Sequence, residues 1–245
     1  MAPVVRVSPG CGLSLDPDAP IVAVGHCRVL EVGDSLGNDL GWGLAREVSP
    51  TSGLELVQAD VSATGLANRA FYDWPAQLEV DLHRYHPQLV LISLGGDDEQ
   101  GMLVDGRAVQ FPTPAWQRAY IGRVASMLAE AVASGAYVLW VGMPVMEQPE
   151  FSAGIALLDS LYLRVVHTFP EAAFVSTWKL FAGPGGRFEQ GAEVDGAPAS
   201  LRQADGVHYS FTGENVLATY VVRQIARIFH VRLAPTDPEV VTGWG

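Results

Sequence analysis

The sequence is poor in positive charge. Lys179 is its only lysine, and 15 Lys and Arg residues stand against 27 Asp and Glu residues, which gives a net charge of −12. Nucleic-acid binding requires a positively charged protein surface, and so does binding to an anionic lipid membrane. The composition therefore argues against nucleic acid or an anionic membrane as a partner, and the acidity is interpreted as a solubility feature.

Long hydrophobic runs and cysteines are also scarce. No stretch of about 18 uninterrupted apolar residues occurs, so no transmembrane span is predicted, and no signal peptide is visible at the N-terminus. Cys11 and Cys27 are the two cysteines. They form either a disulfide, worth about 3 kcal/mol for a loop of this length, or two independent buried thiols. The pair favours an exported or cell-envelope location, with the cytoplasm as the alternative.

Apolar segments of strand and helix character alternate along the chain. With 245 residues, 49% of them hydrophobic, the chain is long enough to bury the core of one domain. Strands are predicted at 28–32, 54–57, 89–94, 137–141 and 173–176, and helices after Ser35 and at about 75–84, 113–134, 154–168 and 212–229. This alternation predicts an α/β fold, a three-layer α/β/α sandwich with a mainly parallel five-stranded sheet. The predicted organisation is an N-terminal arm over 1–26, a main domain over 27–230 and a C-terminal tail over 231–245.

A candidate nucleophile follows the first predicted strand of the main domain. The segment Gly33–Leu36 reads Gly-Asp-Ser-Leu and precedes an amphipathic helix. Ser35 is therefore expected at a helix N-terminus, where free backbone N–H groups point outward. A serine hydroxyl is a weak nucleophile at neutral pH, so it needs a nearby base and donors for the developing negative charge.

A candidate base stands near the C-terminus. The segment Asp205–His208 reads Asp-Gly-Val-His and lies in a glycine-containing loop. At this spacing the Asp205 carboxylate can accept a hydrogen bond from His208 Nδ1–H and leave Nε2 free to take the proton of Ser35. Because ligands bind beyond the carboxyl ends of parallel strands, Ser35, Gly65, the 95–98 loop and Met143 are all expected at one edge of the sheet.

These motifs together resemble the SGNH/GDSL hydrolase family. The Gly-Asp-Ser-Leu and Asp-x-x-His segments match its first and last blocks, and Ser62–Leu66, followed by Asp73-Trp74-Pro75, is similar to a bacterial branch of largely unassigned function. The resemblance implies a flavodoxin-like fold and a Ser35, His208 and Asp205 triad. It also implies an oxyanion hole made by the backbone N–H groups of Ser35 and Gly65 and by an asparagine side chain.

The expected asparagine is absent. The family's Gly-x-Asn-Asp block reads Gly-Gly-Asp-Asp over Gly95–Asp98, so Asp97 stands in its place. An ionised carboxylate donates no hydrogen bond, and losing one donor costs about 10²–10³ in rate. Three alternatives follow. Burial keeps Asp97 protonated so that it donates, or its side chain is rotated away from the oxyanion hole, or the protein is catalytically impaired. Asp34, Trp140 and Met143 are the candidates for pocket residues.

The sequence thus predicts a serine esterase that removes a small acyl group, such as acetyl, from a carbohydrate or another envelope-associated alcohol. Neither a metal nor an organic cofactor is required. An O-acyltransferase that uses the same acyl-enzyme and a non-catalytic binding protein with this fold are the alternatives. The oligomeric state is left open.

Overall fold

A parallel sheet organises the molecule. The computed structural model describes residues 11–48 and 52–233. Its main sheet has the order β3-β2-β4-β7-β8, and every neighbouring pair is parallel. The strands are β2 (Cys27–Gly33), β3 (Leu54–Gln58), β4 (Leu89–Ser93), β7 (Tyr137–Val141) and β8 (Ala172–Val175). The central strands β4 and β7 are buried along their whole length, as their continuous apolar sequences require.

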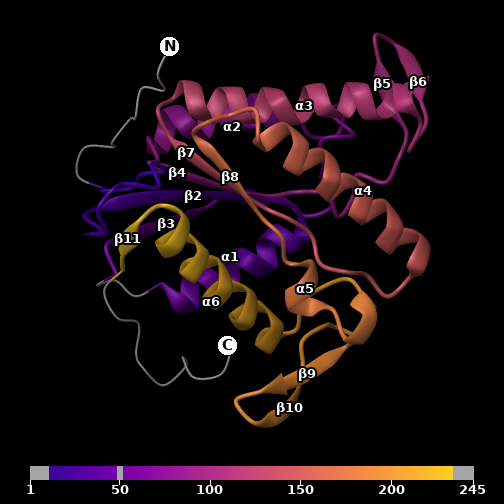
Figure 1. Ribbon diagram of the computed structural model, residues 1–245. Coiled ribbons are helices and arrows are strands. Elements are labelled where there is room, and N and C mark those ends of the chain that lie inside the picture. Colours follow the sequence, from indigo (N-terminus) through magenta and orange to yellow (C-terminus); the bar gives the residue numbers. More distant parts are fainter. Residues whose placement is uncertain (1–10, 49–51, 234–245) are drawn as a thin grey trace.

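Helices cover both faces of this sheet (Figure 1). One layer contains α1 (Ser35–Glu47) and α6 (Phe211–Ile228), which pack against each other. The opposite layer contains α2 (Trp74–Tyr85), α3 (Pro114–Ala133) and α4 (Pro149–Val166). The predicted three-layer sandwich and its five-stranded sheet are confirmed. No helix in the described ranges is long and apolar enough to cross a membrane.

Most helices begin at the signals that the sequence provides. Asp34 caps α1 by accepting a hydrogen bond from the backbone N–H of Leu36, and Thr113 does the same for α3, with Pro114 at its first position. Ser210 caps α6. Such caps satisfy N–H groups that have no partner inside the helix, which fixes the first turn and the direction of the preceding residues.

The two ends of the described chain pack together with the main domain. Cys11 and Cys27 form a disulfide, which settles the choice that the sequence left open. Strand β1 (Val22–Ala23), from the predicted arm, pairs in parallel with β11 (Val231–Arg232), from the predicted tail. Leu13 belongs to the same buried core as the sheet. Residues 1–10 of the predicted arm and 234–245 of the predicted tail lie outside the described residues.

Several small elements have no counterpart in the sequence prediction. A hairpin of β5 (Met102–Val104) and β6 (Arg107–Val109) precedes α3. A short 3-10 turn over Pro184–Gly186 precedes a second hairpin, β9 (Gly191–Val194) and β10 (Ala197–Ser200). The one-turn helix α5 (Trp178–Phe181) follows β8. Both hairpins stand at the periphery of the sandwich (Figure 1).

Candidate active site

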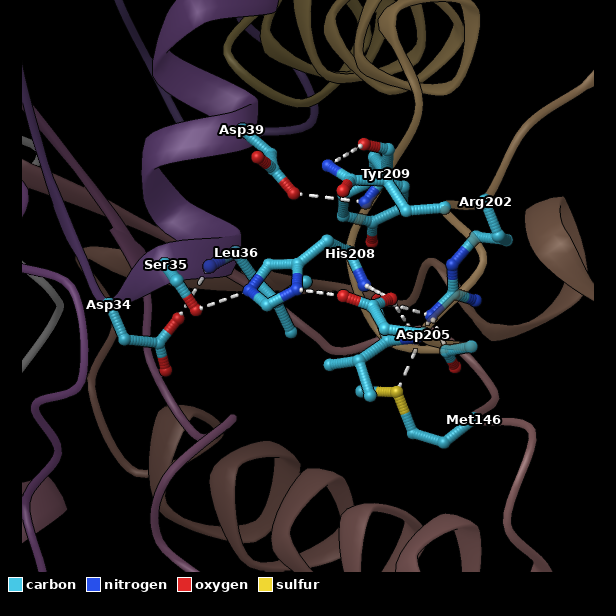
Figure 2. Close-up of polar contacts among 12 residues, drawn as sticks. Asp34, Ser35, Leu36, Asp39, Met146, Arg202, Asp205, His208 and Tyr209 are labelled. Atoms are coloured by element: carbon cyan, nitrogen blue, oxygen red, sulfur yellow. Dashed lines mark hydrogen bonds and ion pairs between the residues drawn. The ribbon is translucent and has the colours of Figure 1, made fainter.

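Ser35, His208 and Asp205 form one chain of hydrogen bonds (Figure 2). The Ser35 hydroxyl lies 2.9 Å from His208 Nε2, and His208 Nδ1 lies 2.7 Å from Asp205 Oδ2. An ionised carboxylate only accepts, so Nδ1 carries the proton and Nε2 accepts from Ser35. The structure thus brings together the candidate nucleophile and the candidate base from opposite ends of the sequence, at the carboxyl edge of the sheet.

Asp205 also holds the loop that carries the base. Its Oδ1 accepts hydrogen bonds from the backbone N–H groups of Val207 and His208, at 2.9 and 3.0 Å. Desolvation raises the pKa of Asp205, but the hydrogen bonds from the His208 side chain and from these two N–H groups outweigh it and lower the pKa to about 2. The carboxylate therefore stays ionised at neutral pH and fixes the tautomer of the imidazole.

Two buried side chains anchor the His208 loop to the rest of the fold. Asp39, one turn beyond Ser35 on α1, accepts a hydrogen bond from the backbone N–H of Tyr209 at 2.9 Å. Arg202 is 1% exposed and donates to the carbonyl oxygens of Val145 and Val207. Asp39 and Arg202 appear on both sides of the triad in Figure 2. Sequence reasoning missed both, because neither lies in a recognisable motif.

Asp34 joins the nucleophile to the neighbouring loop. Its carboxylate accepts hydrogen bonds from the backbone N–H of Leu36 at 2.9 Å and from those of Gly95 and Gly96 at 2.8 and 2.7 Å. Burial raises the pKa of Asp34 to about 7, although these three hydrogen bonds lower it. Asp34 is fully buried, so the prediction that it lines a pocket is wrong. It instead positions Ser35 relative to the 95–98 loop.

Asp98 performs a similar role for the segment that contains Gly65. It accepts hydrogen bonds from the backbone N–H groups of Leu66 and Ala67, at 3.1 and 2.6 Å, and from the Tyr120 hydroxyl at 2.5 Å. A Cβ atom at Gly65 would lie 2.3 Å from Asp98 Oδ1, so only glycine fits at this position. The N–H of Gly65, expected to be an oxyanion donor, therefore lies on a segment fixed by buried hydrogen bonds.

A buried tyrosine pair extends this network into α3 and α4. The hydroxyls of Tyr120 and Tyr162 lie 2.7 Å apart. Gly95 has φ +142°, and a Cβ atom there would lie 2.6 Å from the Tyr162 hydroxyl. The tyrosine pair thus connects the segment after Gly65 with the start of the 95–98 loop. No sequence motif predicted a role for these tyrosines.

Asp97 lies within electrostatic range of the triad. Burial raises the pKa of its carboxyl, and the nearby charge of His208 opposes this effect. In the part of the chain that the structure describes, no hydrogen bond to the Asp97 carboxyl is present, whereas Asp34 and Asp98 each have three donors. A half-buried carboxyl with a raised pKa is more readily protonated, and its O–H can then donate a hydrogen bond.

The two other predicted pocket residues belong to the core. Trp140 is fully buried and stacks on Tyr162 with ring centroids 4.6 Å apart. Met143 is 1% exposed. The pocket prediction is wrong for both, because side chains without exposed surface do not line an open cavity. A cavity of about 660 Å³ lies instead between the residues after Gly65, the β5–β6 hairpin and α3.

Comparison with known proteins identifies the family. A family model described as Protein of unknown function (DUF459) matches residues 28–224. The chain belongs to this family. The matched range includes all three residues of the hydrogen-bonded chain. No significant match is found among curated proteins.

Solved structures of this family's fold are numerous, at low sequence identity. TesA is 23% identical, over 82% of this chain and 99% of that one, with a TM-score of 0.54. A GDSL-like lipase from Bacteroides thetaiotaomicron is 18% identical, with coverages of 82% and 89% and a TM-score of 0.58. A catalytic mutant of Axe2, an acetylxylan esterase from Geobacillus stearothermophilus, is 18% identical, with coverages of 87% and 99% and a TM-score of 0.55. The DUF459 chain therefore has the fold of GDSL-type hydrolases.

Proposed function

We propose that this protein is a serine esterase. The observation that carries the proposal is the chain of hydrogen bonds from Ser35 through His208 to Asp205. In the first step Ser35 Oγ attacks the ester carbonyl carbon while His208 Nε2 takes the hydroxyl proton. His208 then returns this proton to the departing alcohol. A water molecule, deprotonated by His208, hydrolyses the resulting acyl-enzyme and regenerates Ser35.

The negative oxygen of each tetrahedral intermediate requires donors. The backbone N–H groups of Ser35 and Gly65 supply two of them, at a helix N-terminus and on a segment held by Asp98. Asp97 supplies the third in its protonated form. Its raised pKa and the lack of a hydrogen-bond partner among the described residues support this role. The protonated fraction of Asp97 falls as the pH rises, so activity is expected to fall toward high pH.

The proposed substrate is an ester of a small acyl group, such as acetyl, on a carbohydrate or similar alcohol. The cavity beyond Gly65 supports a hydroxyl-rich alcohol because polar side chains form much of its wall. These polar residues are Asn68, Arg69, Gln100, Asp105, Gln110 and Arg123. Gln100 also donates a hydrogen bond to the backbone carbonyl of Asp97, so the cavity adjoins the proposed oxyanion hole. The acetylxylan esterase among the structures of similar fold agrees with this substrate class.

Hydrolysis of p-nitrophenyl acetate between pH 5 and 9 tests the proposal. Ser35→Ala is expected to lower kcat by at least about 10³-fold, since the nucleophile is lost. Asp97→Asn is expected to keep its activity to higher pH, because an amide donates whatever the pH. Ser160→Ala changes an exposed serine on α4 and serves as the matched control.

The outcomes separate the alternatives. Equal, low activity of the native chain and Ser35→Ala, with turnover restored by Asp97→Asn, would indicate a hydrolase scaffold inactivated at one residue. Inertness of all variants, together with no reaction of Ser35 with an active-site phosphonate, would leave a binding protein. Formation of an acylated sugar instead of acetate, with sugar present as acceptor, would identify an acyltransferase.

A further inference from the structure

A second pair of carboxyl groups lies beneath the helix that carries Ser35. Glu31 occupies the middle of β2, where strands β3 and β4 pair with it on both sides. Its side chain is fully buried, and no described residue donates a hydrogen bond to either carboxyl oxygen. Burying a carboxylate without partners is costly, so a strand position in the sheet centre is an unfavourable place for an ionised glutamate.

Asp60 faces Glu31 across the glycine face of α1. A Cβ atom at Gly37 would lie 3.3 Å from Glu31 Oε1 and 3.1 Å from Asp60 Oδ1. A Cβ atom at Gly41 would lie 2.9 Å from Glu31 Oε2 and 3.0 Å from Asp60 Oδ2. Beside Gly37, and again beside Gly41, one oxygen of Glu31 and one oxygen of Asp60 therefore lie close together. The two carboxyl groups are adjacent. Glycines one turn apart leave the room that this pair occupies.

The surroundings provide no compensating cation. None of the ion pairs between described residues includes Glu31 or Asp60. The packed elements present Asn38 and the Asp34 carboxyl from α1, the Gln58 amide from β3 and the Ser93 carbonyl from β4. Burial and the neighbouring carboxyl of Asp60 raise the pKa of Glu31 well above its ordinary value, and burial raises the pKa of Asp60.

We propose that Glu31 and Asp60 share one proton, and that this carboxylic acid–carboxylate pair holds α1 against the sheet so that Ser35 stays in register with the Gly65 segment. The protonated group donates to the other carboxylate, which gives the orphaned oxygens a partner. Asn38 on α1 donates from Nδ2 to Asp60 Oδ2 at 3.4 Å, and its Oδ1 accepts from Ser62 at 3.5 Å. The pair therefore connects the nucleophile helix with the residues before Gly65.

The shared proton makes stability depend on pH in a defined direction. Glu31 has a raised pKa in the folded state, so the folded protein holds a proton that the unfolded chain releases near its ordinary value of 4.5. Stability is unaffected by Glu31 below that pH and falls as the pH rises toward the folded-state pKa. Loss of the proton leaves two adjacent negative charges under α1, which repel each other in a medium that screens them weakly.

Thermal unfolding of the full chain between pH 5 and 9 tests the shared proton. Glu31→Gln keeps the shape and donates permanently to Asp60. The difference in Tm, variant minus native, is expected to rise with pH by at least about 5 °C over this range. Asp60→Asn is the second variant and is expected to behave alike. Glu79→Gln, on the exposed face of α2, is the control and is expected to follow the native pH profile.

Two results would overturn the proposal. A Tm difference independent of pH in both variants would exclude a shared proton. A native Tm that EDTA lowers and CaCl₂ restores, with neither effect in Glu31→Gln, would show that a divalent cation joins the carboxylates instead. Both results come from thermal unfolding and need no enzyme activity. Failure of the shared-proton proposal can therefore be distinguished from failure of the proposed function.

The positioning role rests on the proposed function and has its own readout. Ester hydrolysis by Glu31→Gln is expected to extend to higher pH than that of the native chain, with kcat changed more than KM. An unchanged activity profile beside a changed stability profile would restrict the pair to a structural role.

Discussion

Two sets of buried carboxyl groups near the start of α1 differ in what surrounds them. Asp34 and Asp98 each accept three hydrogen bonds, chiefly from backbone N–H groups of loops that carry the proposed site. Among the described residues, Glu31 has no hydrogen-bond donor, and Asp60 accepts one side-chain hydrogen bond, from Asn38. A buried carboxylate with several donors organises a loop, whereas one without donors requires a proton. Hydrogen bonds from several donors therefore offset part of the cost of burying Asp34 and Asp98, whereas Glu31 has no such donor among the described residues.

The largest effect is expected from removing a fully bonded carboxylate. Asp98→Ala leaves the N–H groups of Leu66 and Ala67 unpaired in the interior, at about 1–3 kcal/mol each, and removes one of the two partners of the Tyr120 hydroxyl. The free energy of unfolding, measured by urea denaturation, should fall by at least about 3 kcal/mol. Asp18→Ala, in an exposed loop, is the control. A loss below about 1 kcal/mol would mean that these donors find other partners, and the contrast with Glu31 would then disappear.

Asp34→Ala is expected to have the next largest effect. It removes the cap of α1, worth about 1 kcal/mol, and leaves the N–H groups of Gly95 and Gly96 without their acceptor. Urea denaturation should show a loss of about 2–3 kcal/mol. The rate at which a phosphonate labels Ser35 should fall as well, because the nucleophile loses its connection to the 95–98 loop. Unchanged labelling would assign Asp34 to stability alone.

The smallest effect is expected at the edge of the same network. Tyr120→Phe removes one donor to Asp98 and the contact with the Tyr162 hydroxyl, while two backbone donors stay in place. The expected loss of unfolding free energy is about 1 kcal/mol. Tyr85→Phe, at the end of α2, is the matched control. A loss as large as that of Asp98→Ala would show that the tyrosine, and not the backbone donors, stabilises the carboxylate.

Sequence patterns predicted the main elements well. The run 89–94 and the strand 137–141 were recognisable because strands buried on both faces are continuously apolar, and α3 was marked by Thr113-Pro114. The two hairpins were missed, since strands of three or four residues have too few positions to show a period. Trp140 was misplaced because an apolar strand end is compatible with both a core and a pocket.

The sequence by itself determined the local features of this protein. The order of strands and helices, the capped start of α1 at Ser35 and the spacing of Asp205 and His208 all depend on residues close together in the chain. The tertiary structure decided which distant residues meet. Asp98 reaches Leu66 and Ala67, and Asp60 faces Glu31, only because β2, β3 and β4 lie side by side in the sheet. The burial of each carboxyl group and the number of hydrogen-bond donors around it depend on these tertiary contacts, and neither can be predicted from a short motif.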